Sequence, residues 1–531
     1  MKIKVKIETK SPLLVSEEFS RIWNKSQKRD KNGTSYIPGS ALKGAFRETA
    51  DTLPNYKKEV SDLFGESHTK MGKLQFSKLV CYNPSYVEKT HVVIDRKTRT
   101  SSYQRLYSTN ALSSGNVLEG YIYFDEQLTD REKELLELLT SLVKKIGGMK
   151  SAGYGSVDIF FEYEDNNQVN QETNKKIYDN YALLVLEPLE PFLTVKERSK
   201  KYMYKSSKII NGETVRGAYA NKLAKNPYFK NIIFNEEVKF PTLFPSKEEI
   251  VVAPTPFTTM KEKYRDNPEE LFDLTIPKII EKEINKEQLR ISLEDISLTG
   301  ERLENASGYL DYFNHKIISV ESDTKQYTQT AVSRKTRATK SGEMRSYITE
   351  YYDKMVGIIR STKKEYFEAL SEIDYITIGN SKTRGFGKMK ARILPLDDLK
   401  EKFKENINSF TCVVNSYIKP EKVYIPLLLT SDLIIPVNKT LDEIFEDKGF
   451  KINQQIYRKD KFTSWNVRTN NIKTAYETIK SGAVIILESE DINCVDKVWQ
   501  MFLDGLGHRT GSGFGSFLVV DFSKIKTFSR V

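Results

Sequence analysis

The chain has 531 residues, several times the roughly 100–200 of a single domain, so we exclude one compact fold and expect about two to four domains. Its 83 Lys and Arg against 72 Asp and Glu give a formal net charge of +11, which favours a polyanionic partner. Three widely spaced cysteines and four scattered histidines exclude a disulfide framework and a zinc ribbon, so we expect no metal and no cofactor. The lack of a long apolar run predicts a protein without membrane partners, in the reducing cytoplasm.

The first predicted elements are a strand and a basic helix. Residues 2–9 alternate charged and β-branched side chains, which predicts a strand and differs from the apolar run of a signal peptide. A helix is predicted to follow Pro38-Gly39, with Ser40 as N-cap. Lys43 and Arg47 lie four residues apart and share a face of this helix, whose start could meet a phosphate. The alternative is a solvated basic stripe.

Two tracts combine basic and aromatic residues in a pattern that suits single-stranded RNA, because cations hold phosphates and tyrosine rings stack on bases. The first contains Arg96, Lys97, Arg99, Tyr103, Arg105 and Tyr107, and the second contains Arg334, Lys335, Arg337, Lys340, Arg345 and Tyr347. The alternative is loop charge exposed to solvent. Trp465, between Lys461 and Arg468, is assigned to the core or to a subunit interface rather than to a base contact.

A glycine-rich loop occurs three times, over residues 147–155, 379–387 and 507–515. Each copy ends in Gly-aromatic-Gly, carries a base (Lys150, Arg384 or Arg509) and leads into a predicted strand over 157–163, 389–394 or 517–522. Helices are predicted before the first loop, from a capping box at Thr129 to Ile146, and before the third, over 492–503. The order helix, loop, strand is the reverse of a nucleotide-cofactor site, which needs strand, loop, helix.

The repeat predicts an α+β protein of tandem ferredoxin-like modules, each with the order β-α-β-β-α-β. Opening strands are predicted over 2–9, 181–186 and 423–429. A polar linker over 164–176 and a charged helical connector over 397–408 separate the modules. The expected domains are residues 1–165, residues 180–395 with insertions, and a smaller domain over 420–531.

Glycines let a backbone approach a phosphate closely, and a neighbouring base supplies charge. The loops therefore contribute candidate RNA-binding residues, namely Lys150, Ser151, Gly153, Gly155, Arg384, Gly385, Gly387 and Arg509. The alternative is a tight helix-to-strand turn with no ligand.

Residues 36–47, Tyr-Ile-Pro-Gly-Ser-Ala-Leu-Lys-Gly-Ala-Phe-Arg, resemble the signature of the RAMP superfamily, the ferredoxin-like RNA-binding subunits of CRISPR effector complexes. Leu63-Phe64-Gly65, residues 94–99 and the first glycine loop follow in the family's order, and residues 209–218, with Arg216, form a degenerate second copy. The whole chain resembles the large multi-domain RAMP subunit of subtype III-D complexes. The resemblance implies an antiviral ribonucleoprotein subunit that holds the 5′ tag of the guide RNA. It also implies contacts with the large polymerase-like subunit and backbone RAMP subunits, and indirectly with target RNA.

Catalysis is the weaker hypothesis. In target-cleaving subunits of the superfamily an aspartate precedes the Ile-Pro-Gly-Ser motif, and here the corresponding residue is Asn24, which cannot take a proton or bind Mg²⁺ as a carboxylate does. Glu17 and Glu18 are remote substitutes, and His91 and His508 have no visible acid or base partner. We therefore expect no catalytic residue. The alternatives are an endoribonuclease that cleaves target or precursor guide RNA, and a protein-docking subunit with little RNA contact.

Overall fold

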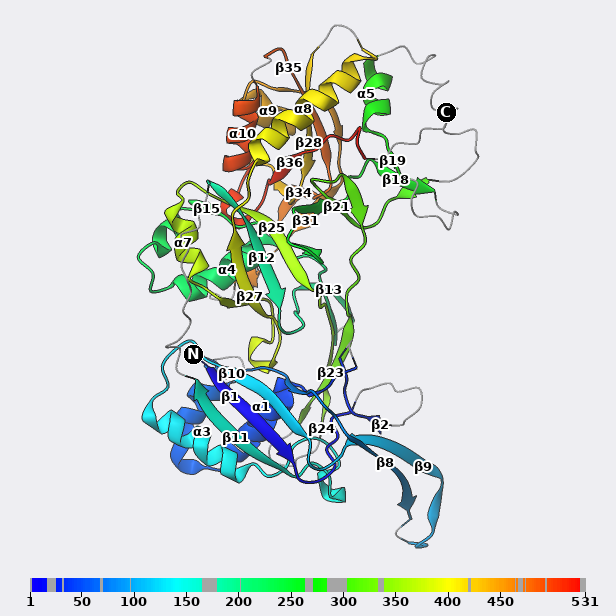
Figure 1. Ribbon diagram of the computed structural model, residues 1–531, viewed down its shortest axis with the longest axis vertical. Helices are drawn as coiled ribbons and strands as arrows, with labels where there is room; N and C mark the ends of the chain where they lie inside the picture. Colours follow the sequence, from blue (N-terminus) through cyan, green and yellow to red (C-terminus); the bar gives the residue numbers. More distant parts are fainter. Residues whose placement is uncertain are drawn as a thin grey trace.

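The computed structural model describes residues 2–16, 25–30, 33–66, 70–95, 97–164, 179–200, 202–262, 271–283, 303–332, 339–418, 422–463, 465–466, 471–472, 474–491 and 494–525. Three α+β modules follow one another along its longest axis, with the N-terminal module at one end and the C-terminal module at the other (Figure 1). Module 1 spans β1 to β11, module 2 spans β12 to β27, and module 3 spans β28 to β36.

Module 1 is built on the antiparallel sheet β11-β1-β10-β7-β3, with β6 also paired to β10. Its strands are β1 (Lys2–Thr9), β3 (Ser35–Ile37), β6 (Gln75–Phe76), β7 (Leu79–Cys81), β10 (Val117–Tyr123) and β11 (Val157–Glu164). The helices are α1 (Gly39–Ala50), α2 (Lys57–Phe64) and α3 (Asp130–Leu142). A hairpin of β8 (Tyr86–Ile94) and β9 (Ser101–Leu112), with β2 (Lys25–Ser26) along β9, projects from this sheet, and β4 (Gly65–Glu66) pairs with β5 (Lys70–Met71).

The local sequence accounts for these elements. Alternation along β1 buries Ile3, Val5 and Ile7 on one face, as predicted. The predicted capping box of α3 is present, since Thr129 accepts from the Glu132 N–H. The predicted end of this helix at Ile146 is wrong, because α3 stops at Leu142. The next residues must be extended to pair with the start of β11, where Lys145 bridges Ser156.

Module 2 repeats the arrangement in the sheet β15-β25-β12-β27-β26, with β16 also on β25. Its sheet strands are β12 (Tyr181–Pro188), β15 (Val238–Lys239), β16 (Phe244–Ser246), β25 (Lys354–Ser361), β26 (Tyr375–Thr377) and β27 (Lys388–Leu394). Its helices are α4 (Gly212–Leu223) and α7 (Glu365–Ser371), and a π-helical turn covers Lys230–Phe234.

Smaller sheets are inserted in module 2. They contain β13 (Val195–Lys200), β14 (Met203–Ser206), β17 (Val252–Pro254), β18 (Thr259–Glu262), β19 (Leu271–Asp273), β20 (Leu303–Asn305), β21 (Tyr309–Asp311), β22 (Lys316–Ile318), β23 (Lys325–Val332) and β24 (Thr339–Thr349), beside helix α5 (Thr275–Glu283). The β23–β24 hairpin extends down to module 1 (Figure 1).

Module 3 has the sheet β30-β35-β28-β36, formed by β28 (Val423–Leu429), β30 (Lys451–Ile456), β35 (Val484–Ser489) and β36 (Phe517–Val519). Its helices are α9 (Leu441–Glu446) and α10 (Val495–Asp504), and its short strands are β29 (Leu433–Ile434), β31 (Lys459–Phe462), β32 (Trp465–Asn466), β33 (Asn471–Ile472) and β34 (Tyr476–Ile479). The predicted strand over 517–522 is too long, because the chain turns at Asp521, whose carboxylate accepts from Ser523.

Each sheet contains four strands in the ferredoxin-like order, in which the fourth strand of the unit lies beside the first, followed by the third and the second. These strands are β11-β1-β10-β7 in module 1, β27-β12-β25-β15 in module 2 and β36-β28-β35-β30 in module 3. The predicted fold class is confirmed.

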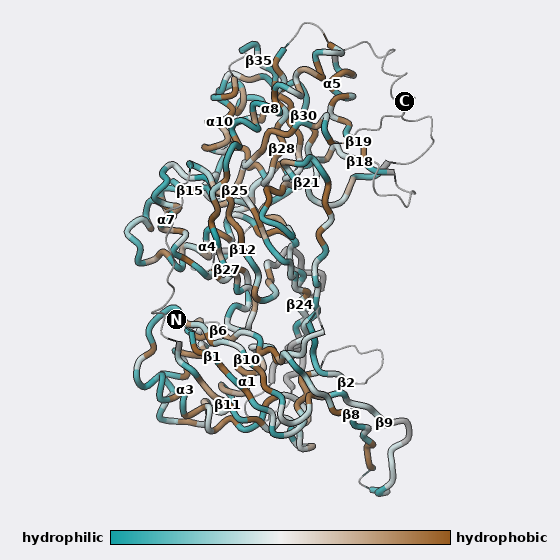
Figure 2. The backbone as a smooth tube through the Cα atoms, in the orientation of Figure 1, coloured by the Kyte–Doolittle hydropathy of each residue, from teal (hydrophilic) through white to brown (hydrophobic). Residues whose placement is uncertain are grey.

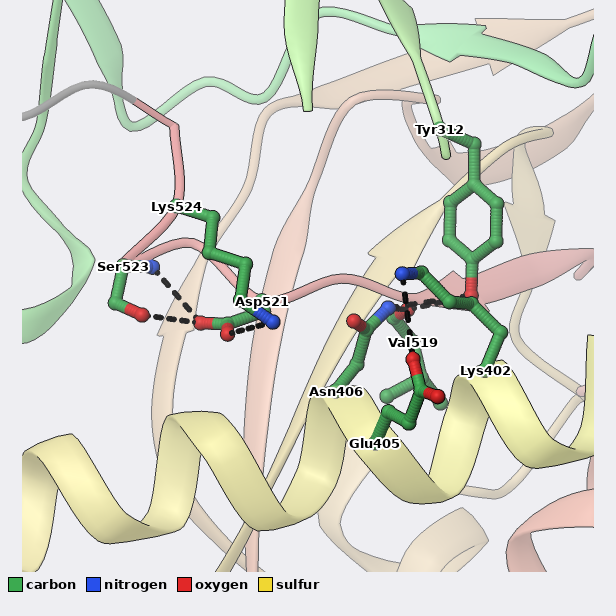
Figure 3. Close-up of polar contacts among 8 residues, drawn as sticks. All are labelled: Tyr312, Lys402, Glu405, Asn406, Val519, Asp521, Ser523 and Lys524. Atoms are coloured by element: carbon green, nitrogen blue, oxygen red, sulfur yellow. Dashed lines mark hydrogen bonds and ion pairs between the residues drawn. The ribbon is translucent and has the colours of Figure 1, made fainter. Parts of the chain in front are cut away.

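A continuous core joins modules 2 and 3, so the domain boundaries stay a prediction. Helix α8 (Leu399–Asn415), longer than the predicted connector, packs along β28, and one buried cluster contains side chains of both modules. The apolar colouring of β28 in Figure 2 follows this core. In Figure 3, Tyr312 from the insertion of module 2 and Asn406 from α8 both donate to the Val519 carbonyl, at 3.0 and 2.8 Å.

Candidate nucleic-acid interface

The three glycine loops share one backbone conformation. Each contains a short 3-10 turn, over Lys150–Ala152, Lys382–Arg384 or Thr510–Ser512. Left-handed residues flank each turn, with φ of 55° and 85° at Met149 and Gly153, 58° and 85° at Ser381 and Gly385, and 61° and 86° at Arg509 and Gly513. The structure therefore confirms that the sequence repeat is a structural repeat.

The final glycine of each loop is required by the loop itself. A Cβ on Gly155, Gly387 or Gly515 would lie 2.1, 1.8 or 1.8 Å from the carbonyl oxygen of the residue just before its loop, and each φ is positive. The close approach at Gly155 and Gly387, predicted from the sequence for a phosphate, is thus made to the chain's own backbone. Phosphate binding at these two glycines stays a prediction.

Loop 2, residues 379–387, lies on the start of α1 in module 1. A Cβ on Gly385 would be 2.9 Å from the Phe76 carbonyl oxygen and 3.6 Å from the Gly39 Cα. A Cβ on Gly39 would lie 2.2 Å from the same oxygen, so the helix must begin with glycine to fit beneath this strand. The prediction of Ser40 as N-cap is wrong for this reason: Pro38 is the capping residue, and Ser40 lies within the helix.

This docking brings three of the predicted RNA-binding cations together. Lys43 on α1 faces Arg47 and, from loop 2, Arg384. Burial, and then the charges of Arg47 and Arg384, lower the pKa of Lys43 to about 7. In the part of the chain that the structure describes, no hydrogen bond or ion pair of Lys43 is found, whereas Arg47 donates to the Phe64 carbonyl at 3.1 Å and lies 4.0 Å from Asp51. Lys43, in the second turn of α1, and Arg384 lie near the start of the helix, whereas Arg47 lies in its last turn. An anion would be stabilised near Lys43 and Arg384.

A cavity of about 150 Å³ opens next to these cations, between modules 1 and 2. Its walls include the rings of Tyr36, Tyr327 and Tyr351 as well as Ser40, Arg384 and Gly385. Two ammonium groups lie over these rings: Lys78 is 6.0 Å from the Tyr36 centroid and 5.8 Å from that of Tyr351, and Lys325 is 5.6 Å from that of Tyr36. The cavity therefore combines aromatic faces with hydrogen-bond donors.

Glu190 is the buried acid of this cavity, and no sequence pattern pointed to it. Its carboxylate accepts the backbone N–H of Lys78 at 2.7 Å, and the side chain is 4% exposed. Burial raises the pKa of Glu190 to about 7, an effect that the charge and N–H of Lys78 partly offset. Near neutral pH this carboxyl group can therefore donate as well as accept a hydrogen bond.

Loop 3, residues 507–515, meets α4 of module 2, and here the predicted bases contact protein. Arg216 donates to the Ser512 hydroxyl at 2.6 Å and lies 3.3 Å from Glu236. Arg509 donates to Glu213 at 2.8 Å, with both side chains 16% exposed. A guanidinium group that is bound to a protein carboxylate is less available to bind a phosphate. The contacts found for Arg216 and Arg509 join modules 2 and 3.

The remaining predicted residues lie away from this junction. Arg99 is exposed in the turn of the β8–β9 hairpin, Tyr103 and Arg105 belong to β9, and Lys150 is 3.7 Å from Glu48. Ser151 and Gly153 are exposed. Arg96, Arg334, Lys335 and Arg337 lie outside the described residues. Of the second tract, Arg345 is exposed and Tyr347 is buried, with its ring stacked on Tyr204.

No arrangement for cleavage is seen in the described residues. His91 hydrogen-bonds the hydroxyls of Thr109 and Tyr154, at 3.2 and 3.1 Å, and stacks on Tyr107. Asn24, Glu17 and Glu18 lie outside the described ranges. Within those ranges no group of three or more His, Cys, Asp or Glu side chains is placed to hold a metal ion, and no helix is long and apolar enough to cross a membrane.

Comparison with protein families decides the kind of module. The family model of the RAMP superfamily matches residues 6–158, nearly all of module 1. Module 1 is a RAMP-superfamily domain. The signature over residues 36–47 forms the end of β3 and the first nine residues of α1 in this RAMP domain, and its Lys43 and Arg47 contribute to the cation cluster at the junction. The comparison with curated proteins finds no match.

Among solved structures, the chain is similar to chains of the type III-B Cmr-beta complex. In the apo state the identity is 11%, over 31% of this chain and 98% of the other, with a TM-score of 0.27. For a chain of the complex bound to cognate target RNA, the identity is 18% over 30% of this chain and 59% of the other, with a TM-score of 0.27. For a chain of the complex bound to cognate target RNA and AMPPnP, the identity is 16% over 57% of this chain and 86% of the other, with a TM-score of 0.34.

Proposed function

We propose that this protein is an RNA-binding subunit of a type III CRISPR effector complex, of subtype III-D, and that it holds the 5′ tag region of the guide RNA. One observation carries the proposal. The RAMP domain and loop 2 of module 2 together place Lys43 and Arg384 near the start of α1, with Arg47 further along the same helix, beside a cavity lined by tyrosines. The partners that we propose are the polymerase-like subunit and backbone RAMP subunits, with target RNA reached through the guide.

The arrangement suits one nucleotide with its phosphate. The phosphate would lie at the α1 N-terminus between Lys43 and Arg384, where the helix dipole and the cations act together. The base would enter the cavity, which at about 150 Å³ is roughly ten times what one water needs, and stack on a tyrosine ring. Glu190 and the ammonium of Lys78 would hydrogen-bond the edge of the base.

A subunit that positions RNA without cleaving it needs no metal ion, and no group of three or more His, Cys, Asp or Glu side chains in the described part of the chain is placed to hold one. We therefore propose holding rather than cleavage. The endoribonuclease alternative is tested by incubating the protein with precursor and target RNA in Mg²⁺ or Mn²⁺, where reproducible cuts would favour it.

The pKa of Lys43 provides the test of the RNA site. A phosphate binds the ammonium form of Lys43. Because the pKa of Lys43 in the free protein is about 7, RNA binding at or above this pH takes up protons. We expect the affinity for single-stranded tag RNA to fall as the pH rises from about 6 to about 8, and as salt rises from about 50 to about 200 mM. Lys43→Arg, which stays charged, should remove most of the pH effect, and Glu190→Gln should remove what remains. Titration of labelled RNA measures both; affinity independent of pH and salt would contradict the proposal.

A further inference from the structure

Two successive module junctions are built in the same way. At the first, Gly385 of loop 2 lies over Gly39, the first residue of α1. At the second, Gly513 of loop 3 lies over Gly212, the first residue of α4, and a Cβ on Gly513 would be 3.0 Å from the Gly212 Cα. In both cases the glycine turn of one module covers a helix that begins with glycine in the module before it.

The surface beneath each turn is also the same. A Cβ on Gly385 would lie 2.9 Å from the Phe76 carbonyl oxygen, and a Cβ on Gly513 would lie 2.1 Å from that of Phe240. A Cβ on Gly39 or Gly212 would lie 2.2 or 2.3 Å from these same oxygens. Each turn therefore docks on a small surface, called here the plate, made of a helix-start glycine and the carbonyl of a phenylalanine at the end of a strand (Phe76) or directly after one (Phe240). Only glycines on both sides allow this approach.

Loop 1, residues 147–155, has the docking conformation, but within the part of the chain that the structure describes no such plate lies against it. Its φ angles of 55° at Met149 and 85° at Gly153 match those of the two docked loops within a few degrees. Ser151, Ala152 and Gly153 are exposed, and nothing lies within 4 Å of a Cβ built on Gly153. The equivalent residues of loop 3, Gly511, Ser512 and Gly513, are buried. Loop 1 is therefore preformed for a contact that none of the described residues supplies.

The hairpin beside loop 1 supports the same conclusion independently. In module 2 the β23–β24 hairpin lies on module 1, where Lys325 donates to the Arg29 carbonyl at 2.7 Å and Lys28 lies 4.8 Å from the Tyr327 ring. The hairpin at the same place in module 1, β8–β9, extends away from the molecule (Figure 1). Its Val92, Ile94 and Leu106 are 49%, 63% and 65% exposed. Val92 pairs with Leu106 across the strands and forms an apolar face with it, and Ile94 lies next to this pair beyond a register shift.

A second copy of this chain cannot supply the plate. Loops 2 and 3 already cover the starts of α1 and α4. Helix α9, the first helix of module 3, begins with Leu441, and its N-terminal amides are satisfied by a capping box between Thr440 and Glu443. The partner must therefore be another chain whose own helix-start plate is free.

We propose that loop 1 and the apolar face of the β8–β9 hairpin form the docking surface for a different RAMP-type subunit, which presents a glycine-started helix beside a strand carbonyl. The interface would repeat the two junctions inside this chain, and the partner would extend the row of modules beyond module 1. The inference rests on the repeated junction and the RAMP domain, not on RNA binding by this chain.

The test uses the full-length chain, tagged and expressed with the RAMP proteins encoded beside it. Gly153→Trp puts a large side chain where the partner's plate would lie, and Ala152→Trp does so without replacing a glycine of positive φ. Gly449→Trp is the matched control, because Gly449 is exposed in module 3 with φ of 83° and open space around its Cβ. Protein subunits and guide RNA are quantified separately after affinity purification.

We expect both loop 1 variants to reduce recovery of one RAMP subunit about tenfold or more, with guide RNA per tagged chain unchanged and the control behaving as wild type. A photo-crosslinker at Ala152 should label a helix that begins with glycine in that subunit. The inference is overturned if no RAMP subunit co-purifies with the wild-type chain, if the variants retain every subunit, or if they lose RNA while keeping all proteins, since loop 1 would then bind RNA.

Discussion

Gly513→Ala should destabilise the protein by about 4 kcal/mol or more, while Gly153→Ala should cost only about 1–2 kcal/mol. Both glycines have φ near 85°, so the backbone strain of an alanine is the same at the two positions. They differ in their surroundings, because a Cβ would be 2.1 Å from the Phe240 carbonyl oxygen at Gly513 and in open space at Gly153. The difference between the two variants isolates the energy of module docking.

Urea unfolding followed by circular dichroism measures both free energies, and tryptophan fluorescence follows module 3 through Trp465 and Trp499, with a further contribution from Trp23 of module 1. We expect the first unfolding transition to move to lower urea in Gly513→Ala. Equal losses at both positions would mean that only strain is measured, and that the junction between modules 2 and 3 contributes little.

Reversing two charges of the cation cluster should have the largest effect on RNA. The double variant Lys43→Glu with Arg384→Glu replaces two attractive charges at the proposed phosphate site by two repelling ones, so we expect affinity for tag RNA to fall about a hundredfold. The matched control is Lys404→Glu on α8, where the lysine is exposed and lies 4.0 Å from Glu401. Its loss of affinity should be less than about threefold.

Thermal unfolding of the double variant is the control for folding. We expect only a small change, because Arg384 is exposed and a carboxylate at position 43 would attract the Arg47 cation that repels Lys43 in the wild type. If the folded double variant binds RNA as well as the Lys404→Glu variant does, the junction is not the binding site.

Much of the fold follows from local sequence. Alternation predicted β1 over residues 2–9 with its observed bounds, and the capping box predicted the start of α3. The end of α3 could not be predicted in this way. Its leucine pattern continues to Ile146, and only the pairing of Lys145 with Ser156, a tertiary contact, makes the last residues extended.

The candidate site depends on contacts between modules, which no local pattern records. Arg384 meets Lys43 only because loop 2 lies on α1, and Glu190 enters the cavity only because it reaches the backbone of Lys78. The sequence identified the three glycine loops and their basic side chains, and it predicted RNA binding for all three loops alike. The structure separates them by their surroundings: Arg509 is paired with Glu213, Arg384 faces a cation cluster, and loop 1 is exposed.

The most direct test of the central claim is to find where the RNA touches the protein. Guide RNA with 4-thiouridine at each position of its 5′ tag is assembled with the full-length chain, irradiated, and the crosslinked peptides are identified by mass spectrometry. We predict crosslinks to Tyr36, Tyr327 or Tyr351 and to peptides that contain Lys43 or Arg384, all around one cavity. Crosslinks confined to module 3 or to loop 1, with none at the junction of modules 1 and 2, would contradict the account.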